Sequence, residues 1–230
     1  MKPLVITIDG PSGTGKSTAA RRLARRLGYL YLDTGAMYRA VALKALRAGA
    51  SLKDRRRLAG LARSSRISFS RGSRQVRVLL DGTDVTLAIR RPEVSEAASV
   101  VATVPGVRRA LVRQQQAIGA AGGIVAEGRD TGTVVFPGAD LKVFLTATLA
   151  QRARRRFEEL QSAGHRLSLA EVLREMRARD LRDRRRASSP LRRAKGAVLV
   201  DNTRLKSDQV LDKLSDYARR IIREGGGCLD

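Results

Sequence analysis

Short apolar runs alternate with longer amphipathic segments along this chain of 230 residues. The run Leu4–Ile8 ends at Asp9-Gly10-Pro11, a pattern typical of a buried strand followed by a turn. Similar short runs occupy Ile124–Ala126, Leu141–Leu145 and Ala197–Val200. Strands that are apolar on both faces indicate a parallel sheet covered by helices on both sides. The hydrophobic pattern therefore predicts an α/β fold built on a parallel sheet.

Helical periodicity fills most of the chain between these runs. In Lys16–Leu27 the apolar residues recur on one face, and Gly28 is placed to end the helix. Thr34 is a suitable N-cap for the next helix, which Gly49 would close. The helices that we predict are about Lys16–Leu27, Thr34–Ala48, Pro92–Val101, Val107–Ala120, Ala150–Arg186 with a break near Gly164, and Ser207–Arg223.

One segment departs from this alternation of strands and helices. Arg66–Thr86 shows the alternation of a strand, with turn signals at Gly72 and at Asp81-Gly82. We predict a small antiparallel sheet there and interpret it as an insertion, because the rest of the chain follows the α/β pattern. The chain length fits a single domain that carries insertions.

The composition narrows the class of protein. Apolar residues make up 43% of the chain and charged residues 30%, and no apolar run approaches the roughly 18 residues of a membrane span. The first residues enter a strand pattern without an export signal, so we expect a cytoplasmic protein. The single cysteine, Cys228, excludes a disulfide framework and a cysteine metal site within the chain, and we expect a free thiol.

The net charge of +24 is the most unusual feature of the composition. A diffuse positive surface would suit nucleic acid, whereas a cleft lined with arginine would suit a small polyanion such as ATP. Only 3% of the residues are aromatic and none is Trp, which disfavours a platform for stacking RNA bases. We therefore expect no nucleic-acid partner.

Gly10–Ser17 matches the phosphate-binding pattern G-x-x-x-x-G-K-[ST]. It joins the apolar strand Leu4–Ile8 to an amphipathic helix, which is the context that this motif requires. The glycines let backbone amides turn toward a phosphate, Lys16 brings a positive charge to the β and γ phosphates, and the Ser17 hydroxyl is a ligand for Mg²⁺. The predicted ATP-binding residues are Gly10, Pro11, Ser12, Gly13, Thr14, Gly15, Lys16, Ser17 and Thr18.

The segment Leu32–Arg39 is a candidate for a second anion site. Arg39 lies one helical turn beyond Gly35, and a kinase for a small molecule needs an acceptor site opposite its phosphate loop. By itself the segment could equally be an ordinary helix start.

Four segments resemble bacterial cytidylate kinases, in the order and with the spacing of that family. They are Thr7–Thr18, Leu32–Arg39, Glu127–Pro137 and the pattern Arg179-Asp180-x-x-Asp183-x-x-Arg186. The resemblance extends over essentially the whole chain, including the insertion at Arg66–Thr86.

This resemblance implies transfer of a phosphate from ATP, with Mg²⁺, to CMP or dCMP. It also implies a P-loop NTPase fold, with a parallel sheet core flanked by helices, a nucleoside-monophosphate-binding insertion with a small antiparallel sheet, and a helical lid. We expect one domain over residues 1–230, with a core of about 1–35, 104–150 and 190–230, a monophosphate-binding region of about 36–103 and a lid of about 151–189. We also expect a monomer without a membrane partner.

The resemblance implies an acceptor site around Arg129 and Asp130, which follow the strand Ile124–Ala126. Ligands bind at the carboxyl ends of such strands, so Arg129 would hold the acceptor phosphate. Asp130 can accept a hydrogen bond from the amino group of cytosine, where uracil presents a carbonyl. A surface ion pair is the alternative for these two residues. The CMP-binding residues implied are Thr34, Tyr38, Arg39, Ser99, Arg108, Arg129, Asp130, Arg179, Asp183 and Arg186, with Arg109 as a possible replacement for Arg108.

Arg179, Asp183 and Arg186 are spaced i, i+4 and i+7, which puts them on one face of a helix. Such a face could be an ion-pair ladder in solvent. The excess of neighbouring arginines favours a triphosphate partner instead, because too few carboxylates are available to pair them; these are Arg182, Arg184 and Arg185.

We expect catalysis by positioning and charge neutralisation, with Lys16, Arg129 and Arg186 as the catalytic residues. A phosphate acceptor is already an anion, so no general base is required. The chain departs from the family at Gln115-Gln116, where the family often has Gln-Arg, and at Thr131, where Ile or Met is common; we expect the latter change to have little effect.

Three other functions stay open from the sequence: a kinase for UMP or AMP, a kinase for a non-nucleotide such as shikimate, and an RNA-binding P-loop protein. The insertion at Arg66–Thr86 and the pair Arg129-Asp130 argue against the second, and only the net charge of +24 supports the third.

Overall fold

The computed structural model describes residues 2–71, 76–162, 164 and 166–225. By its internal contacts the chain divides into two compact units. The first comprises Met1–Tyr31 and Gly122–Asp230, and the second comprises Leu32–Ala121. The predicted α/β fold is confirmed.

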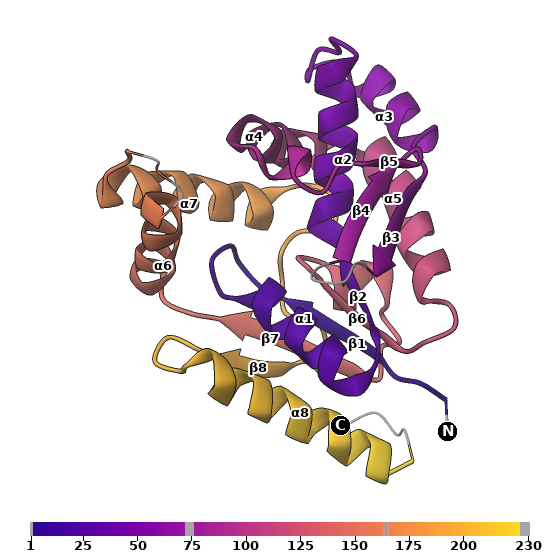
Figure 1. Ribbon diagram of the computed structural model, residues 1–230, viewed down its shortest axis with the longest axis vertical. Coiled ribbons are helices and arrows are strands. Elements are labelled where there is room, and N and C mark those ends of the chain that lie inside the picture. Colours follow the sequence, from indigo (N-terminus) through magenta and orange to yellow (C-terminus); the bar gives the residue numbers. More distant parts are fainter. Residues whose placement is uncertain (1, 72–75, 163, 165, 226–230) are drawn as a thin grey trace. The chain divides into compact units, whose positions relative to one another are not determined.

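A five-stranded sheet of order β2-β6-β1-β7-β8 forms the core of the first unit (Figure 1). β1 pairs in parallel with both β6 and β7, and β7 pairs in parallel with β8. In the register of β1 and β6, Asp9 lies opposite Gly128, so the two strands end together. The strands are β1 (Val5–Asp9), β2 (Leu30–Asp33), β6 (Ile124–Gly128), β7 (Leu141–Thr146) and β8 (Val198–Asp201); β2 begins in the first unit and ends in the second.

Helices cover this sheet. The N-terminal helix α1 packs against β6 and against the C-terminal helix α8. α6 and α7 pair with each other through a small apolar cluster of Ala153, Val172 and Met176 (Figure 1). The bounds are α1 (Lys16–Leu27), α6 (Leu149–Ser162), α7 (Leu169–Arg185) and α8 (Ser207–Arg223).

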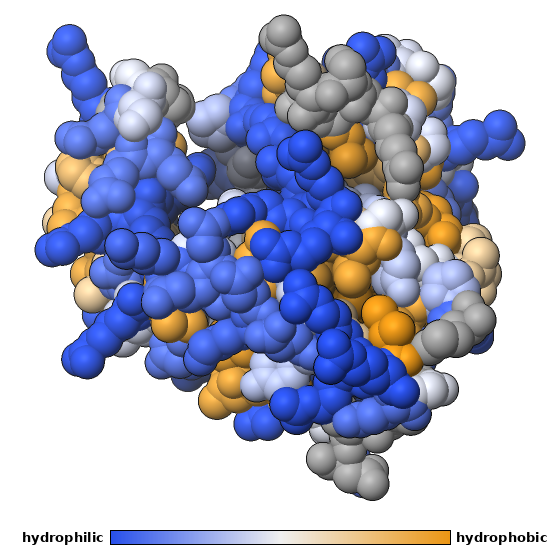
Figure 2. Space-filling model, turned by 60° about the horizontal axis from the view of Figure 1, so that its bottom comes forward, coloured by the Kyte–Doolittle hydropathy of each residue, from blue (hydrophilic) through white to orange (hydrophobic). Residues whose placement is uncertain are grey.

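Part of the arginine excess on α1 is paired. Arg22 and Arg26 form ion pairs with Asp208 and Asp212 of α8. All four side chains are more than one-third exposed, so each pair contributes only about 0–1 kcal/mol. Figure 2, turned so that the α8 side comes forward, shows hydrophilic residues over most of that face. The charge of this region is therefore mainly that of a solvated surface.

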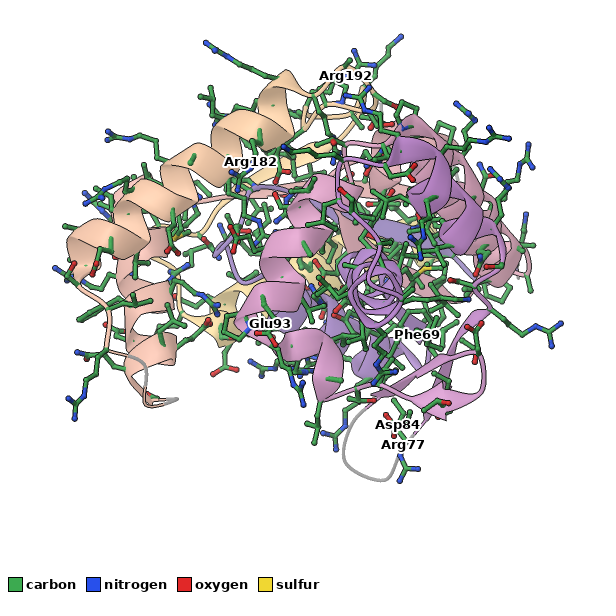
Figure 3. All side chains as sticks on the ribbon, turned by 90° about the horizontal axis from the view of Figure 1, so that it is seen from above. Phe69, Arg77, Asp84, Glu93, Arg182 and Arg192 are labelled. Carbon is green, nitrogen blue, oxygen red and sulfur yellow. The ribbon has the colours of Figure 1, made fainter. Side chains whose placement is uncertain are left out.

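The second unit contains helices and the small antiparallel sheet that the sequence predicts. The sheet has the order β3-β4-β5, and Arg77 of β4 lies 3.9 Å from Asp84 of β5 (Figure 3). The elements are α2 (Thr34–Arg47), α3 (Arg55–Arg63), β3 (Ile67–Arg71), β4 (Val76–Leu80), β5 (Thr83–Asp84), a short 3-10 turn (Ala88–Arg90), α4 (Pro92–Val101) and α5 (Pro105–Gly119).

Several details differ from the sequence predictions. The N-cap of α2 is Asp33, whose Oδ1 accepts a hydrogen bond from the Ala36 amide at 2.8 Å, and Thr34 is the first helical residue instead. Asp is as good a cap as Thr, so the pattern did not separate the two. α5 begins at Pro105, since proline suits the first turn of a helix. α5 packs against α3 in the second unit, and β2 was not predicted.

Some predictions fall outside the described residues, namely the turn at Gly72 and the free thiol of Cys228. The predicted division into core, monophosphate-binding region and lid stays a prediction. Among the helices that the structure describes, none is long and apolar enough to cross a membrane.

Leu214→Ala should destabilise the protein by about 2–5 kcal/mol, because Leu214 on α8 is fully buried and its truncation leaves a cavity. Leu199→Ala is the matched control, since Leu199 on β8 is 51% exposed and should change stability by less than about 0.5 kcal/mol. Urea denaturation of both variants measures the difference. Equal midpoints would show that α8 does not contribute to the core.

Candidate active site

The loop between β1 and α1 has a backbone that only glycine accommodates. Gly10 has a φ of 152°, and a Cβ there would lie 2.0 Å from the carbonyl oxygen of Leu145 on β7. Gly15 is left-handed and precedes Lys16, the first residue of α1. The motif therefore occupies the strand–loop–helix junction that phosphate binding requires, with the positive end of the helix dipole at the loop.

Lys16 is buried inside this loop. Its ammonium donates to the carbonyl of Pro11 at 2.7 Å, and the Thr14 hydroxyl donates to the same carbonyl at 3.1 Å. Burial and the positive charges of Arg129 and Arg179 together lower the pKa of Lys16 to about 7, against the opposing charges of Glu127 and Asp9. An anion bound in the loop would raise this pKa again.

Ser17 faces a carboxylate at the end of β6. Its hydroxyl donates to Glu127 Oε1 at 2.6 Å, and the same oxygen accepts from the Tyr31 hydroxyl at 3.2 Å. A hydroxyl beside a carboxylate is a pair of hard oxygen donors, which suits Mg²⁺. The described residues contain no group of three or more His, Cys, Asp or Glu side chains arranged to hold a metal ion.

Asp9 organises the turn that follows β6. Its two carboxylate oxygens accept from the Thr131 amide at 2.9 Å, the Thr131 hydroxyl at 2.8 Å and the Gly132 amide at 2.7 Å. Burial raises the pKa of Asp9, although these hydrogen bonds oppose that effect. The hydrogen bond from the Thr131 hydroxyl is one that Ile or Met, which are more common in the family, could not make.

Arg129 and Asp183 form a part-buried ion pair, with 19% and 14% of the two side chains exposed. Arg129 Nε lies 2.8 Å from Asp183 Oδ2, and NH1 donates to the Gly128 carbonyl at 3.2 Å. Burial alone would raise the pKa of Asp183, but the charge and hydrogen bond of Arg129, together with the charges of Arg179 and Arg186, lower it overall. Asp183 is thus an anion that holds Arg129 at the end of β6.

A second buried pair joins Arg186 to Asp130, with 3.5 Å between NH2 and Oδ1. The predicted helix was too long by one residue: α7 ends at Arg185, and Arg186 has the extended backbone of a C-cap. Arg186 Nε instead donates to the carbonyl of Ser189. The i, i+4, i+7 reasoning therefore holds for Arg179 and Asp183 only. The three other arginines of this turn, Arg182, Arg184 and Arg185, are exposed (Arg182 in Figure 3).

The second unit holds the remaining predicted residues. Arg39 pairs with Asp33 at 2.8 Å, and the guanidinium of Arg108 lies 5.3 Å from the centre of the Tyr38 ring. Arg108 is buried whereas Arg109 is exposed, which favours Arg108 of the two neighbours. Among the described residues, the buried Ser99 hydroxyl and Arg39 Nε have no hydrogen-bond partner.

The predicted residues thus fall into two sets. Thr34, Tyr38, Arg39, Ser99 and Arg108 belong to the second unit. The first unit brings together the phosphate loop with Lys16, Ser17, Arg129, Asp130, Arg179, Asp183 and Arg186.

Sequence reasoning missed several residues that shape the site. The sequence did not single out Asp9, the last residue of β1, or Glu127, the last but one of β6, although their place at the carboxyl ends of strands was a usable signal. Asn202 follows β8 and donates to the carbonyl of Thr14 at 2.5 Å. Arg152 contacts the loop from α6, and nothing in the sequence separates it from the other arginines of that helix.

Comparison with known proteins identifies the family of this chain. A family model described as cytidylate kinase matches residues 6–220. The cytidylate kinase of Desulfitobacterium hafniense is 52% identical over 224 residues, covering 97% of this chain and 96% of the relative. Those of Caldanaerobacter subterraneus and Geobacter sulfurreducens are 47% and 46% identical, with coverage of 94% and 98% of this chain and 94% and 97% of the relatives. The chain belongs to the cytidylate kinase family.

Proposed function

We propose that this protein transfers the γ-phosphate of ATP to CMP or dCMP, giving CDP or dCDP and ADP. The observation that carries the proposal is the complete phosphate loop with Lys16 buried inside it, where burial first, and then the charges of Arg129 and Arg179, lower the pKa of Lys16. Cations gathered at the end of a phosphate loop attract anions. Two phosphorylated substrates would supply those anions.

The donor side is the loop Gly10–Thr18. Its backbone amides and the start of α1 would hold the β and γ phosphates, and Lys16 would move from the Pro11 carbonyl to the phosphates. Kinases of this kind need a divalent metal, and we infer Mg²⁺ here. Ser17 would be its protein ligand, with Glu127 placed to accept hydrogen bonds from metal-bound water. The metal would neutralise charge on the phosphates.

The acceptor side would use Arg129 and Arg186 for the CMP phosphate, and Arg179 and Asp183 for the sugar. Arg129 and Arg186 are each already paired with a carboxylate, which holds the arginine in place before the substrate arrives. Since the CMP phosphate oxygen is an anion at neutral pH, the chain's task is to screen repulsion and align the two substrates. A monomer is sufficient for this chemistry.

Cytosine would be read by Asp130, with Ser99 and Arg108 beside the base. The buried Ser99 hydroxyl, which lacks a hydrogen-bond partner among the described residues, is suited to bind a polar ligand atom. A coupled assay of ADP release with CMP, dCMP, UMP and AMP tests the whole proposal. Turnover with CMP or dCMP well above the others supports it, and salt-sensitive RNA binding without CMP-dependent turnover contradicts it.

ATP binding should take up protons above pH 7. Free Lys16 loses its proton near pH 7, and bound phosphates would restore it, so the complex binds more protons than the free enzyme. The affinity for ATP should therefore fall as the pH rises from about 7 to 9. Calorimetry at pH 8 in two buffers of different ionisation enthalpy measures the uptake. Lys16→Met should abolish the uptake, and an equal heat in both buffers for the wild type would contradict the role of Lys16.

Arg186→Ala should lower kcat by on the order of 10³-fold, since an arginine on a transferring phosphate can contribute 10³–10⁵. The unfolding temperature should stay close to that of the wild type, because the change affects the reaction and not the core. Arg177→Ala is the control, because Arg177 is an exposed arginine of α7. Turnover of Arg186→Ala equal to that of the control would exclude Arg186 from the reaction.

Asp130→Asn should weaken the preference for CMP over UMP by about 10- to 100-fold, as expected for one contact of roughly 1–3 kcal/mol. Asn presents both an acceptor and a donor, so uracil would no longer face a carboxylate. The ratio of kcat/KM for the two nucleotides is the measurement, with Asp212→Asn on α8 as control. An unchanged ratio would place the reading of the base elsewhere.

A further inference from the structure

Arg152 on α6 is, with Arg108, one of two buried arginines among the residues that the structure describes, and 4% of its surface is exposed. Its guanidinium donates in three directions. Nε donates to the carbonyl of Ala147 at 3.0 Å, NH1 to the carbonyl of Ser12 at 3.0 Å, and NH2 to Asp180 Oδ2 at 2.7 Å. One side chain therefore links the end of β7, the phosphate loop and α7.

The contact with Ser12 controls the orientation of a peptide in the phosphate loop. A trans peptide points its N–H away from its C=O, so a fixed Ser12 carbonyl also fixes the Gly13 amide. The loop is tightly packed at this point, because a Cβ on Gly13 would lie 3.2 Å from Arg152 Cβ and 2.8 Å from Met176 Cε. Gly13 is left-handed, with a φ of 75°, as expected where successive amides form an anion-binding turn.

The contact with Asp180 connects Arg152 to the acceptor side. Asp180 lies on α7 between Arg179 and Asp183, the two residues that we place at the acceptor sugar. Its Oδ2 binds Arg152, and its buried Oδ1 has no hydrogen-bond partner among the described residues. Burial lowers the pKa of Arg129, but the charges of Asp183, Glu127 and also Asp180 raise it overall, so Asp180 acts on both guanidinium groups.

We propose that Arg152 is a positioning residue that holds the Ser12–Gly13 peptide of the phosphate loop and, through Asp180, couples the loop to α7. Binding of ATP and binding of CMP would then strengthen each other, because each ligand orders one end of the same linkage. This inference rests on the proposed function.

Only arginine can make this linkage. Its planar fork carries five N–H donors, whereas a lysine ammonium in the same place cannot reach three acceptors in fixed directions. The chain offers a matched control on the same helix. Arg156 also pairs with a carboxylate, Glu159 at 3.1 Å, but the two side chains are 49% and 67% exposed.

Three variants test the proposal: Arg152→Lys, which keeps the charge, the double variant Arg152→Met/Asp180→Asn, which removes both buried charges together, and the control Arg156→Met. The measurements are kcat, the KM values for ATP and CMP, and the dissociation constant of a non-hydrolysable ATP analogue with and without saturating CMP. The dissociation constant of the analogue without CMP, divided by that with CMP, is the coupling factor between the two sites. Circular dichroism identifies the folded variants.

We expect Arg152→Lys to raise the KM for ATP by about 10-fold or more, since a small misplacement of a positioned group is costly. The KM for CMP should change less. In the double variant the coupling factor should fall toward one, while Arg156→Met behaves like the wild type. A merely structural role would lower the unfolding temperature without separating the two KM values.

The proposal is overturned if folded variants of Arg152 keep the ATP constants and the coupling factor of the wild type within about twofold. It is also overturned if the wild type itself shows no coupling. Failure of the proposed function is recognised separately. In that case the wild type lacks CMP-dependent turnover of ATP, whereas a wrong positioning role leaves this turnover intact and still sensitive to Lys16→Met.

Discussion

The parallel pairing of β1 with β6 is the constraint on which the rest of the site depends. Because Asp9 lies opposite Gly128, the phosphate loop and the Arg129-Asp130 turn leave the sheet at the same edge. Asp9 then closes this edge by accepting hydrogen bonds from Thr131 and Gly132. A shift of this register would move the acceptor arginine along the strand by about 3.3 Å per residue and separate it from the loop.

The charged groups of the site differ from the other charged groups of the chain in their burial. Most arginines of the chain lie in solvent, where their charges are screened. Lys16 is buried, and the part-buried Arg129 beside it is paired with Asp183. We propose that these positioned cations, and not the diffuse surface charge, bind the two phosphorylated ligands.

Local patterns in the sequence predicted most of the fold. The strands that precede a turn, the helix Lys16–Leu27 and the antiparallel insertion are confirmed because each is specified by neighbouring residues. The predicted boundaries were wrong at two places. At the N-cap of α2 two neighbouring residues were equally suitable, and α7 ends at Arg185, one residue before the predicted end. The compact unit to which a helix belongs depends on contacts between residues far apart in the sequence. α5, for example, belongs to the second unit, where it packs against α3.

The sequence by itself determined the phosphate loop, since Gly10 and Lys16 act through the backbone conformation and chemistry of one short segment. Only the tertiary structure showed which arginine of α6 contacts the phosphate loop. Arg152 meets Ser12 from 140 positions away and Asp180 from 28 positions away, and its neighbours on α6 have the same chemistry. Burial separates them, because a guanidinium removed from water needs fixed partners whereas an exposed one does not.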